Sequence, residues 1–177
     1  MRFSATPIPG LVVIEEEPSA DHRGSFARVW CGKEFSEAGL ADSFSQVSIS
    51  RNRLSGTLRG IHFQTPPHAE AKLVKVTEGA IWDLALDMRP GSGTYLKWFG
   101  LTLSSENGRS LFIPEGFGHG FLTLTDNAAV MYFITTPFAP GAASGVRWND
   151  PAFAIVWPAA PVIMAEKDRA WPDFKPF

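Results

Sequence analysis

Four polar side chains stand where a purely structural β-strand would not be expected to place them. His62 lies in the strand-like stretch GTLRGIHFQ, and Lys72 begins the apolar run KLVKV. His119 is set among glycines in PEGFGHGF, and Tyr132 lies in AVMYFITTPF. An imidazole, an ammonium group and a phenol can take up, stabilise and return protons, so these residue types can support acid–base chemistry.

The two histidines also suggest a metal centre. The stretch that ends in His119 matches half of the cupin metal pattern, P-x-G-x-x-H, but the other half requires H-x-H where this chain has His62 and Gln64. Glutamine is a poor substitute for imidazole at a transition metal. His68 and Glu70 lie in a proline-rich turn, out of register with the pattern. A metal-dependent cupin is therefore the alternative rather than the main interpretation.

Metal-free proton abstraction uses the same residues differently. A histidine such as His62 removes a C–H proton next to a ketone, a cation such as Lys72 holds the enolate oxygen, and a tyrosine such as Tyr132 returns a proton to the opposite face. An oriented acid or base contributes roughly 10²–10⁴-fold, and stabilisation of the enolate charge is often the larger share. A carboxylate behind His62 would fix its tautomer. Structural roles remain open, because Lys72 could protect a sheet edge and Tyr132 could pack its ring.

Two arginines are each followed by a glycine, which has no side chain to cover the neighbouring backbone. Arg23 and Arg59 each precede a glycine, and a guanidinium group matches the oxygens of a phosphate. Strand alternation places Arg59 on the face opposite to His62, so the two can share a pocket only if the strand bulges at Gly60. We expect such a bulge.

Short runs rich in β-branched and aromatic residues recur along the chain, separated by turn-forming residues. Many short strands at close spacing predict an all-β sandwich or barrel. The runs are GLVVIEE, SFARVW, SQVSIS, KLVKV, AIWDLALDM, LKWFGLTL, SLFIPEG, GFLTLT, AVMYFITT and FAIVWP. We expect an all-β jelly roll of two packed sheets, which can present inward side chains to a pocket at its mouth.

Helix and turn signals are few. Residues 32–40, GKEFSEAGL, predict about two helical turns closed by Gly39. AEKDRAWPDF near the C-terminus predicts a further turn. Residues 78–79, 106–108 and 125–127 predict the tight bends of three hairpins.

Composition and charge argue against several classes of protein. The chain is 45% hydrophobic and 19% charged, which is typical of a globular protein, and residues 1–177 fit one domain. A formal net charge of −2 without a basic run disfavours nucleic acid or an anionic membrane as the main partner. Cys31 is the only cysteine, so no intrachain disulfide can form. Because no apolar run of about 18 residues and no secretory signal is present, we expect a cytoplasmic protein.

Several long motifs follow one another along the chain. They are DHRGSF, GTLRGIHFQTPPHAEAKLVKVTEGAIWDLALDMRPGS, LFIPEGFGHGFLTL, YFITTPFAP and GVRWNDPAFAIVWP. In these motifs the sequence resembles the dTDP-4-dehydrorhamnose 3,5-epimerase family over nearly its whole length. The resemblance implies a cupin-type jelly roll without metal or cofactor, usually a homodimer that exchanges an N-terminal strand. It also implies inversion of C3 and C5 in a nucleotide-diphospho-4-keto-6-deoxy sugar through enolate intermediates.

The resemblance implies a role for each matching position. It makes His62 the proton acceptor, oriented by Asp168; it makes Tyr132 the proton donor and Lys72 the residue that stabilises the O4 enolate. The positions that match substrate-binding residues are Arg23, Phe26, Gln46, Ser48, Arg59, His119, Phe138 and Lys167. The arginines are expected near the diphosphate, and Phe138 against the nucleotide base.

Three positions depart from the family pattern. Arg28 and Ala143 replace glutamates that contact the ligand in many members, and Ser48 replaces a frequent asparagine. The reacting groups are complete while the nucleotide-facing groups differ, which favours an epimerase with another base or sugar over an inactive homologue. Two alternatives stay open: a metal-dependent cupin isomerase or dioxygenase, and a non-catalytic nucleotide-sugar-binding homologue.

Overall fold

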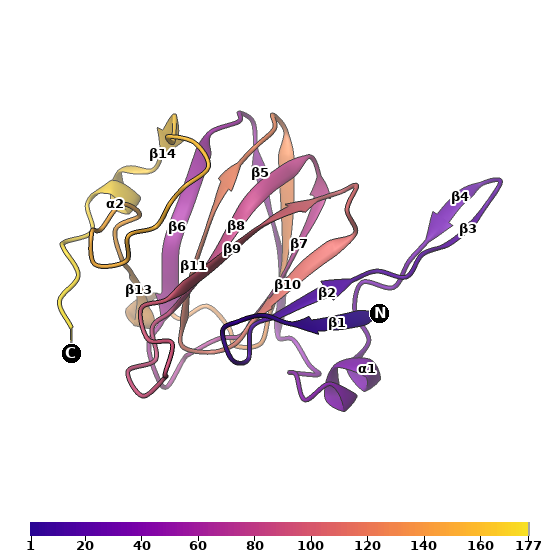
Figure 1. Cartoon of the computed structure of the whole chain (residues 1–177), viewed down its shortest axis with the longest axis horizontal. Coiled ribbons are helices and arrows are strands. Elements are labelled where there is room, and N and C mark those ends of the chain that lie inside the picture. The colour runs from indigo at the N-terminus through magenta and orange to yellow at the C-terminus, as the bar shows by residue number, and fades with distance from the viewer. Residues whose placement is uncertain (177) are drawn as a thin grey trace.

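A computed structural model describes residues 1–176, which form two facing β-sheets with few helices (Figure 1). The first sheet, in spatial order, contains β1 (Arg2–Ala5), β2 (Val12–Glu15), β10 (Arg109–Ile113), β7 (Lys72–Glu78), β12 (Ala128–Ile134) and β5 (Gln46–Asn52). The second contains β13 (Ala143–Gly145), β6 (Thr57–Gln64), β11 (Phe117–Thr123), β8 (Ala80–Asp87) and β9 (Trp98–Ser104). These strands pair antiparallel, while β14 (Ile163–Met164) pairs with β6 in parallel. The prediction of an all-β jelly roll is confirmed.

The core lies between the two sheets and follows from strand alternation. Val74 and Val76 of β7 form one buried cluster with Ile81 of β8 and Phe121 of β11, each 1% exposed or less. Lys72 occupies the same row of β7 as the two valines, since side chains two positions apart share a face. The inward face of β7 is therefore apolar at Val74 and Val76 and ends in the ammonium group of Lys72.

The prediction of three hairpins is wrong. Gly79, at φ +70, joins β7 to β8, and these strands belong to opposite sheets. The turns that contain Gly108, at φ +61, and Asn127, at φ +54, likewise carry the chain from β9 to β10 and from β11 to β12 across the sandwich. A tight turn with a left-handed residue serves both geometries, so the local sequence does not distinguish a hairpin from a crossing between sheets.

The stretch FAIVWP, predicted as a strand, forms no strand in the structure. Phe153, Ile155 and Trp157 lie instead against Leu84 and Leu86 of β8 and cover the outer face of the second sheet. Alternating apolar residues can be buried by a segment lying across a sheet as well as by a strand within it.

Both predicted helical segments are present. The first is α1 (Gly32–Glu37), followed by Gly39 at φ +71, and the second is α2 (Glu166–Arg169). A short 3₁₀ turn, η1, spans Pro140–Ala142. No helix within residues 1–176 is long and apolar enough to cross a membrane.

One hairpin stands apart from both sheets. Within residues 1–176, β3 (Ser19–Asp21) pairs only with β4 (Gly24–Phe26), and this pair projects away from the sandwich on the side of the N-terminus (Figure 1). At the other side of the molecule, β14 and α2 lie over the edge of β6 (Figure 1).

Candidate active site

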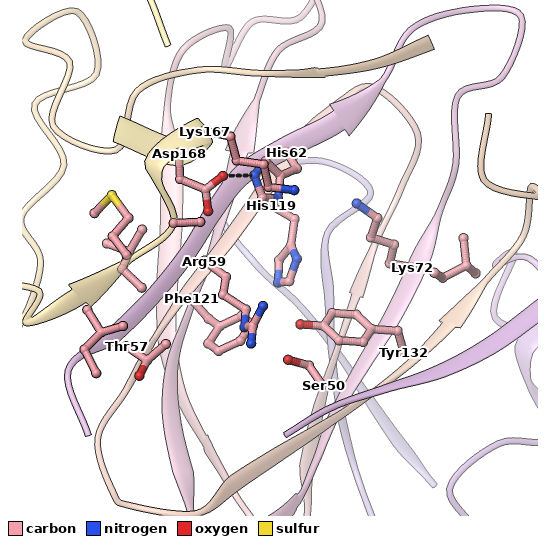
Figure 2. A pocket seen from close by; sticks show the side chains of 15 residues that line it. Ser50, Thr57, Arg59, His62, Lys72, His119, Phe121, Tyr132, Lys167 and Asp168 are labelled. Carbon is pink, nitrogen blue, oxygen red and sulfur yellow. Dashed lines mark hydrogen bonds and ion pairs between the residues drawn. The ribbon is translucent and has the colours of Figure 1, made fainter. Parts of the chain in front are cut away.

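A cavity of about 590 Å³ opens between the two sheets, at the end of the core where Lys72 lies (Figure 2). Side chains of β6 and β11 form one wall, side chains of β5, β7 and β12 form the other, and the β14–α2 segment forms part of the rim. The polar lining residues are Ser50, Thr57, Arg59, His62, Lys72, His119, Tyr132, Lys167 and Asp168. A volume of this size accommodates a small-molecule ligand.

His62 and Asp168 form a hydrogen-bonded pair at the rim. Nε2 of His62 lies 2.7 Å from Oδ1 of Asp168, whose side chain is 2% exposed. The backbone N–H of Gly60 donates to the other carboxylate oxygen at 3.4 Å. Burial alone would raise the pKa of Asp168, but the hydrogen bond and charge of His62 hold this pKa below its usual value. The carboxylate therefore stays ionised and places the hydrogen of a neutral His62 ring on Nε2.

Gly60 produces the bulge that brings Arg59 and His62 to one wall. His62 pairs with His119 and Arg59 pairs with Phe121, so β6 uses one residue more than β11 over the same stretch. Gly60 has φ +124, and a Cβ atom there would lie 2.5 Å from the Cα of Gly120. The predicted bulge is confirmed, and only glycine fits it.

Lys72 is held by the carboxylate of Glu70, a residue whose sequence position suggested only a metal ligand out of register with the cupin pattern. Its Nζ lies 2.9 Å from Oε1 of Glu70, and these side chains are 13% and 7% exposed. The second oxygen of Glu70, Oε2, is buried and has no hydrogen-bond partner within residues 1–176. The two-residue spacing of Glu70 and Lys72 in an extended segment was the available signal for this pair.

Tyr132 stands on the wall opposite to His62 and directs its hydroxyl across the cavity towards Arg59 (Figure 2). Burial, together with the negative charge of Asp83, raises the pKa of the Tyr132 phenol, while the charge of Arg59 opposes this rise. Tyr132 is therefore protonated at neutral pH and available as a proton donor.

His119 forms a second imidazole–carboxylate pair. Its Nε2 lies 2.7 Å from Oδ1 of Asp83, which is fully buried. The ring of His119 also meets that of Tyr132 edge to face, with 5.9 Å between the centroids. Asp83 was missed in the sequence, although an acidic residue on the inward face of the apolar run AIWDLALDM was a usable signal.

The histidines do not converge on a metal-ligand set. His62 and His119 each direct Nε2 to a carboxylate. Within residues 1–176, no group of three or more His, Cys, Asp or Glu side chains is arranged to hold a metal ion.

A second cavity of about 450 Å³ adjoins the first and shares His62, Lys72 and Lys167 with it. Its apolar walls include Phe63, Ile134, Phe138, Ala143 and Trp171. Gln46 accepts a hydrogen bond from the Phe138 backbone N–H at 2.5 Å and so fixes the backbone that carries this ring. Phe138 itself is 64% exposed, which leaves a face of its ring open for stacking.

Three expected binding residues lie outside both cavities. Ser48 faces the same side of β5 as Gln46 and Ser50, because the three alternate along the strand, but it lines neither cavity. Arg23 and Phe26 lie on the projecting hairpin, where their side chains are about 80% exposed. One chain therefore brings together His62, Asp168, Lys72, Tyr132, Arg59, His119, Gln46, Phe138 and Lys167, but not Arg23, Phe26 or Ser48.

The fold and these cavities define a class: a cupin-like jelly-roll protein built for acid–base chemistry on a bound small molecule. The family model for dTDP-4-dehydrorhamnose 3,5-epimerase matches residues 5–176, and the chain belongs to this family. It is accordingly an epimerase, an enzyme of the isomerase class.

Known proteins resemble the chain over nearly its full length. The dTDP-4-dehydrorhamnose 3,5-epimerase of Methanothermobacter thermautotrophicus is 44% identical over 173 residues, which cover 96% of this chain and 92% of the relative. The crystal structure of the Bacillus anthracis epimerase with TDP and PPi bound is 38% identical, with a TM-score of 0.95 and coverage of 98% and 99%. The Legionella pneumophila enzyme in complex with dTDP-4-keto-L-rhamnose is 37% identical, with a TM-score of 0.89 and coverage of 94% and 89%. These findings support the epimerase interpretation rather than the metal-dependent or non-catalytic alternatives.

Proposed function

We propose that the protein epimerises C3, C5 or both carbons of a nucleotide-diphospho-4-keto-6-deoxy sugar, with a TDP-linked sugar as the first candidate. The relatives from B. anthracis and L. pneumophila, with TDP and dTDP-4-keto-L-rhamnose bound, support this substrate class. The observation that carries the proposal is the placement of His62 and Tyr132 on opposite walls of one cavity (Figure 2). Inversion of a carbon requires a proton to leave one face and another to arrive at the opposite face.

His62 acts as the proton acceptor. Because Asp168 binds the hydrogen on Nε2, the lone pair of the basic nitrogen is on Nδ1. Nδ1 takes the proton from the carbon next to the 4-keto group, and the electron pair of the broken C–H bond moves into the enolate. The ionised Asp168 stabilises the imidazolium that forms, as in other pairs of a base and an orienting carboxylate.

Lys72 and Tyr132 complete the exchange. The ammonium group of Lys72 stabilises the negative charge on the O4 oxygen of the enolate. The Tyr132 hydroxyl then gives its proton to the carbon from the other wall, which restores the ketone with the inverted configuration. Solvent returns a proton to Tyr132 and removes one from His62, so the overall reaction is proton-neutral and needs no cofactor.

The remaining groups bind the nucleotide diphosphate. Arg59 and Lys167 supply positive charge at the cavities, and phosphate oxygens match the fork of a guanidinium group. Phe138 offers its ring to the base above the apolar second cavity, which Ala143 also lines. Arg28 pairs with Glu34 at 2.6 Å, so this departure from the family pattern adds no free positive charge to the site.

The protein acts as a homodimer of single-domain subunits in which the projecting hairpin reaches the partner's cavity. Arg23 and Phe26 match ligand-binding positions of the family, yet they line neither of the two cavities that hold the other site residues of their own chain. An exchanged N-terminal segment would place both residues beside a neighbouring site, and Ser48 on the edge strand β5 would lie near the contact. A chain with one cysteine suits the reducing cytoplasm, which is the location we propose.

Deuterium exchange tests the function. The protein is incubated in D₂O with TDP-, GDP- and CDP-linked 4-keto-6-deoxy sugars, and deuterium at C3 and C5 is followed by NMR and mass spectrometry. We expect deuterium at one or both carbons of at least the TDP-linked sugar, and none with the His62→Ala variant. Absence of exchange with every sugar of the panel would contradict the proposal.

A further inference from the structure

The guanidinium group of Arg59 is hydrogen-bonded to Asn52, a buried residue of β5 in the opposite sheet. Oδ1 of Asn52 accepts a hydrogen bond from Nε of Arg59 at 2.7 Å, and Asn52 is 3% exposed. The two residues belong to strands of different sheets, so this hydrogen bond connects the two sheets at Arg59, which lines the cavity.

The environment of Asn52 leaves its amide one orientation. Its Nδ2 donates to the carbonyl oxygens of Ala128, at 3.1 Å, and Ser50, at 3.3 Å. Because a carbonyl oxygen can only accept, the amide nitrogen must face these two groups and the amide oxygen must face Arg59. Ala128 is also the partner of Asn52 in the β5–β12 register, so the strand pairing itself holds the amide in place.

The neutral amide positions the guanidinium without cancelling its charge. Arg28 and Arg89 are each held by a carboxylate, which compensates their charge. Arg59 has no such ion pair within residues 1–176, and its terminal nitrogens make no hydrogen bond to these residues. Its open fork therefore remains available to an anion inside the cavity (Figure 2).

We infer that Asn52 is a positioning residue for diphosphate binding: it fixes Nε of Arg59 so that the two terminal nitrogens face the phosphate oxygens with full positive charge. This inference rests on the proposed function, in which Arg59 binds the diphosphate. Asn52 also keeps the charge of Arg59 near Tyr132, where it opposes the rise of the phenol pKa.

A double-mutant cycle tests the inference. TDP and inorganic pyrophosphate are titrated by calorimetry into the wild-type protein and into the N52A, R59A and N52A/R59A variants. We expect N52A to weaken TDP binding by about tenfold and R59A to weaken it more, with the double variant no weaker than R59A alone, because coupled residues are not additive. Asn149→Ala, which changes an exposed asparagine, is the matched control and should bind TDP as the wild type does.

The outcomes separate this inference from the proposed function. If R59A binds TDP as tightly as the wild type, the diphosphate role of Arg59 fails and the inference fails with it. If R59A binds weakly but the N52A effect persists undiminished in the R59A background, Asn52 acts independently of Arg59 and only the inference is overturned. Binding of TDP to N52A with wild-type affinity would also overturn only the inference.

A measurement on the unaltered protein covers the case in which N52A fails to fold. In ¹⁵N-labelled wild type, the Nε–H signal of Arg59, identified by its loss in R59K, should exchange with water at least about tenfold more slowly than that of the exposed Arg51. Equal exchange rates for Arg59 and Arg51 would show that the hydrogen bond to Asn52 does not persist in solution and would overturn the inference.

Discussion

Nε2 of His62 and Oδ1 of Asp168 lie 2.7 Å apart, although the residues are 106 positions apart in the chain. The contact exists because β14 pairs in parallel with the first half of β6 and delivers α2 to the cavity rim. The proposed base is therefore oriented by a segment that joins the structure near the end of the chain. Changes at Asp168 should affect the chemistry more than the fold.

Asp168→Asn should slow deuterium exchange at the substrate by roughly 10²–10⁴-fold, because the amide neither selects the correct His62 tautomer nor stabilises the imidazolium. Affinity for TDP, measured by calorimetry, should stay close to that of the wild type. Glu166→Gln changes an exposed carboxylate of the same helix and serves as the control. An exchange rate in Asp168→Asn within twofold of the wild type would remove Asp168 from the mechanism.

Tyr132→Phe should separate deprotonation from inversion. His62 remains able to remove a proton and return a deuteron to the same face, so exchange in D₂O should continue. Formation of the inverted sugar should fall by roughly 10²–10⁴-fold, the usual contribution of a positioned acid. The two rates are read from one NMR time course, and inversion that keeps pace with exchange would assign the donor role to another group.

Some features of the site follow from local rules that a sequence displays directly. Side chains of a strand alternate between its two faces, so Arg59 and His62, three positions apart, can share a face only if the strand bulges at Gly60. The same alternation on β7 places Lys72 on the inward face with Val74 and Val76. Both are confirmed because alternation depends only on neighbouring residues. The pairing of His62 with Asp168 came from family resemblance, since no local rule relates positions so far apart in the chain.

Other features depend on which sheet a strand joins, and the sequence does not display this. The turn at Gly79 has the chemistry of a hairpin but connects facing sheets, because a left-handed glycine permits both paths. Asn52 reaches Arg59 only because β5 and β6 lie in different sheets, so neither spacing nor composition indicated this contact. The tertiary arrangement decides such contacts.

Gly60→Ala should destabilise the protein by at least about 2 kcal/mol, since φ +124 is unfavourable for alanine and the new methyl group would meet Gly120. Thermal and urea unfolding measure the loss. Gly91→Ala is the matched control, because a Cβ atom at Gly91 has no neighbour within 4 Å. Equal stability of the two variants would show that the bulge is not required.

Asp87 should confer stability that depends on pH. Burial alone would raise its pKa, but hydrogen bonds from Arg89, Ser92 and Thr94 hold the pKa well below the usual range. A depressed folded-state pKa means that the stabilisation is complete above the unfolded-state value of about 4 and is lost as the pH falls below it.

Asp87→Asn should therefore cost about 3 kcal/mol at pH 7, because the charge of the half-buried Arg89 loses its partner. The difference from the wild type should shrink as the pH is lowered from 5 to 3, as measured by urea unfolding at each pH. Asp21→Asn, at an exposed ion pair with Arg23, should change stability little and provides the comparison. A difference that is independent of pH would contradict this assignment.

The proposed dimer leads to a prediction of its own, because Arg23 on the projecting hairpin lines neither site cavity of its own chain. If Arg23 serves the partner's site, each site combines His62 of one subunit with Arg23 of the other. His62→Ala and Arg23→Ala proteins should then each have little or no epimerase activity alone.

When these two variants are unfolded together and refolded as a mixture, half of the dimers should contain one chain of each kind. Each mixed dimer has one site with both residues intact, so activity should recover to about a quarter of the wild-type value. Light scattering should report a mass of two chains for wild type and mixture alike. If Arg23 instead served the cavity of its own chain, every site would lack one of the two residues and the mixture would stay inactive. A monomeric mass would contradict the dimer directly.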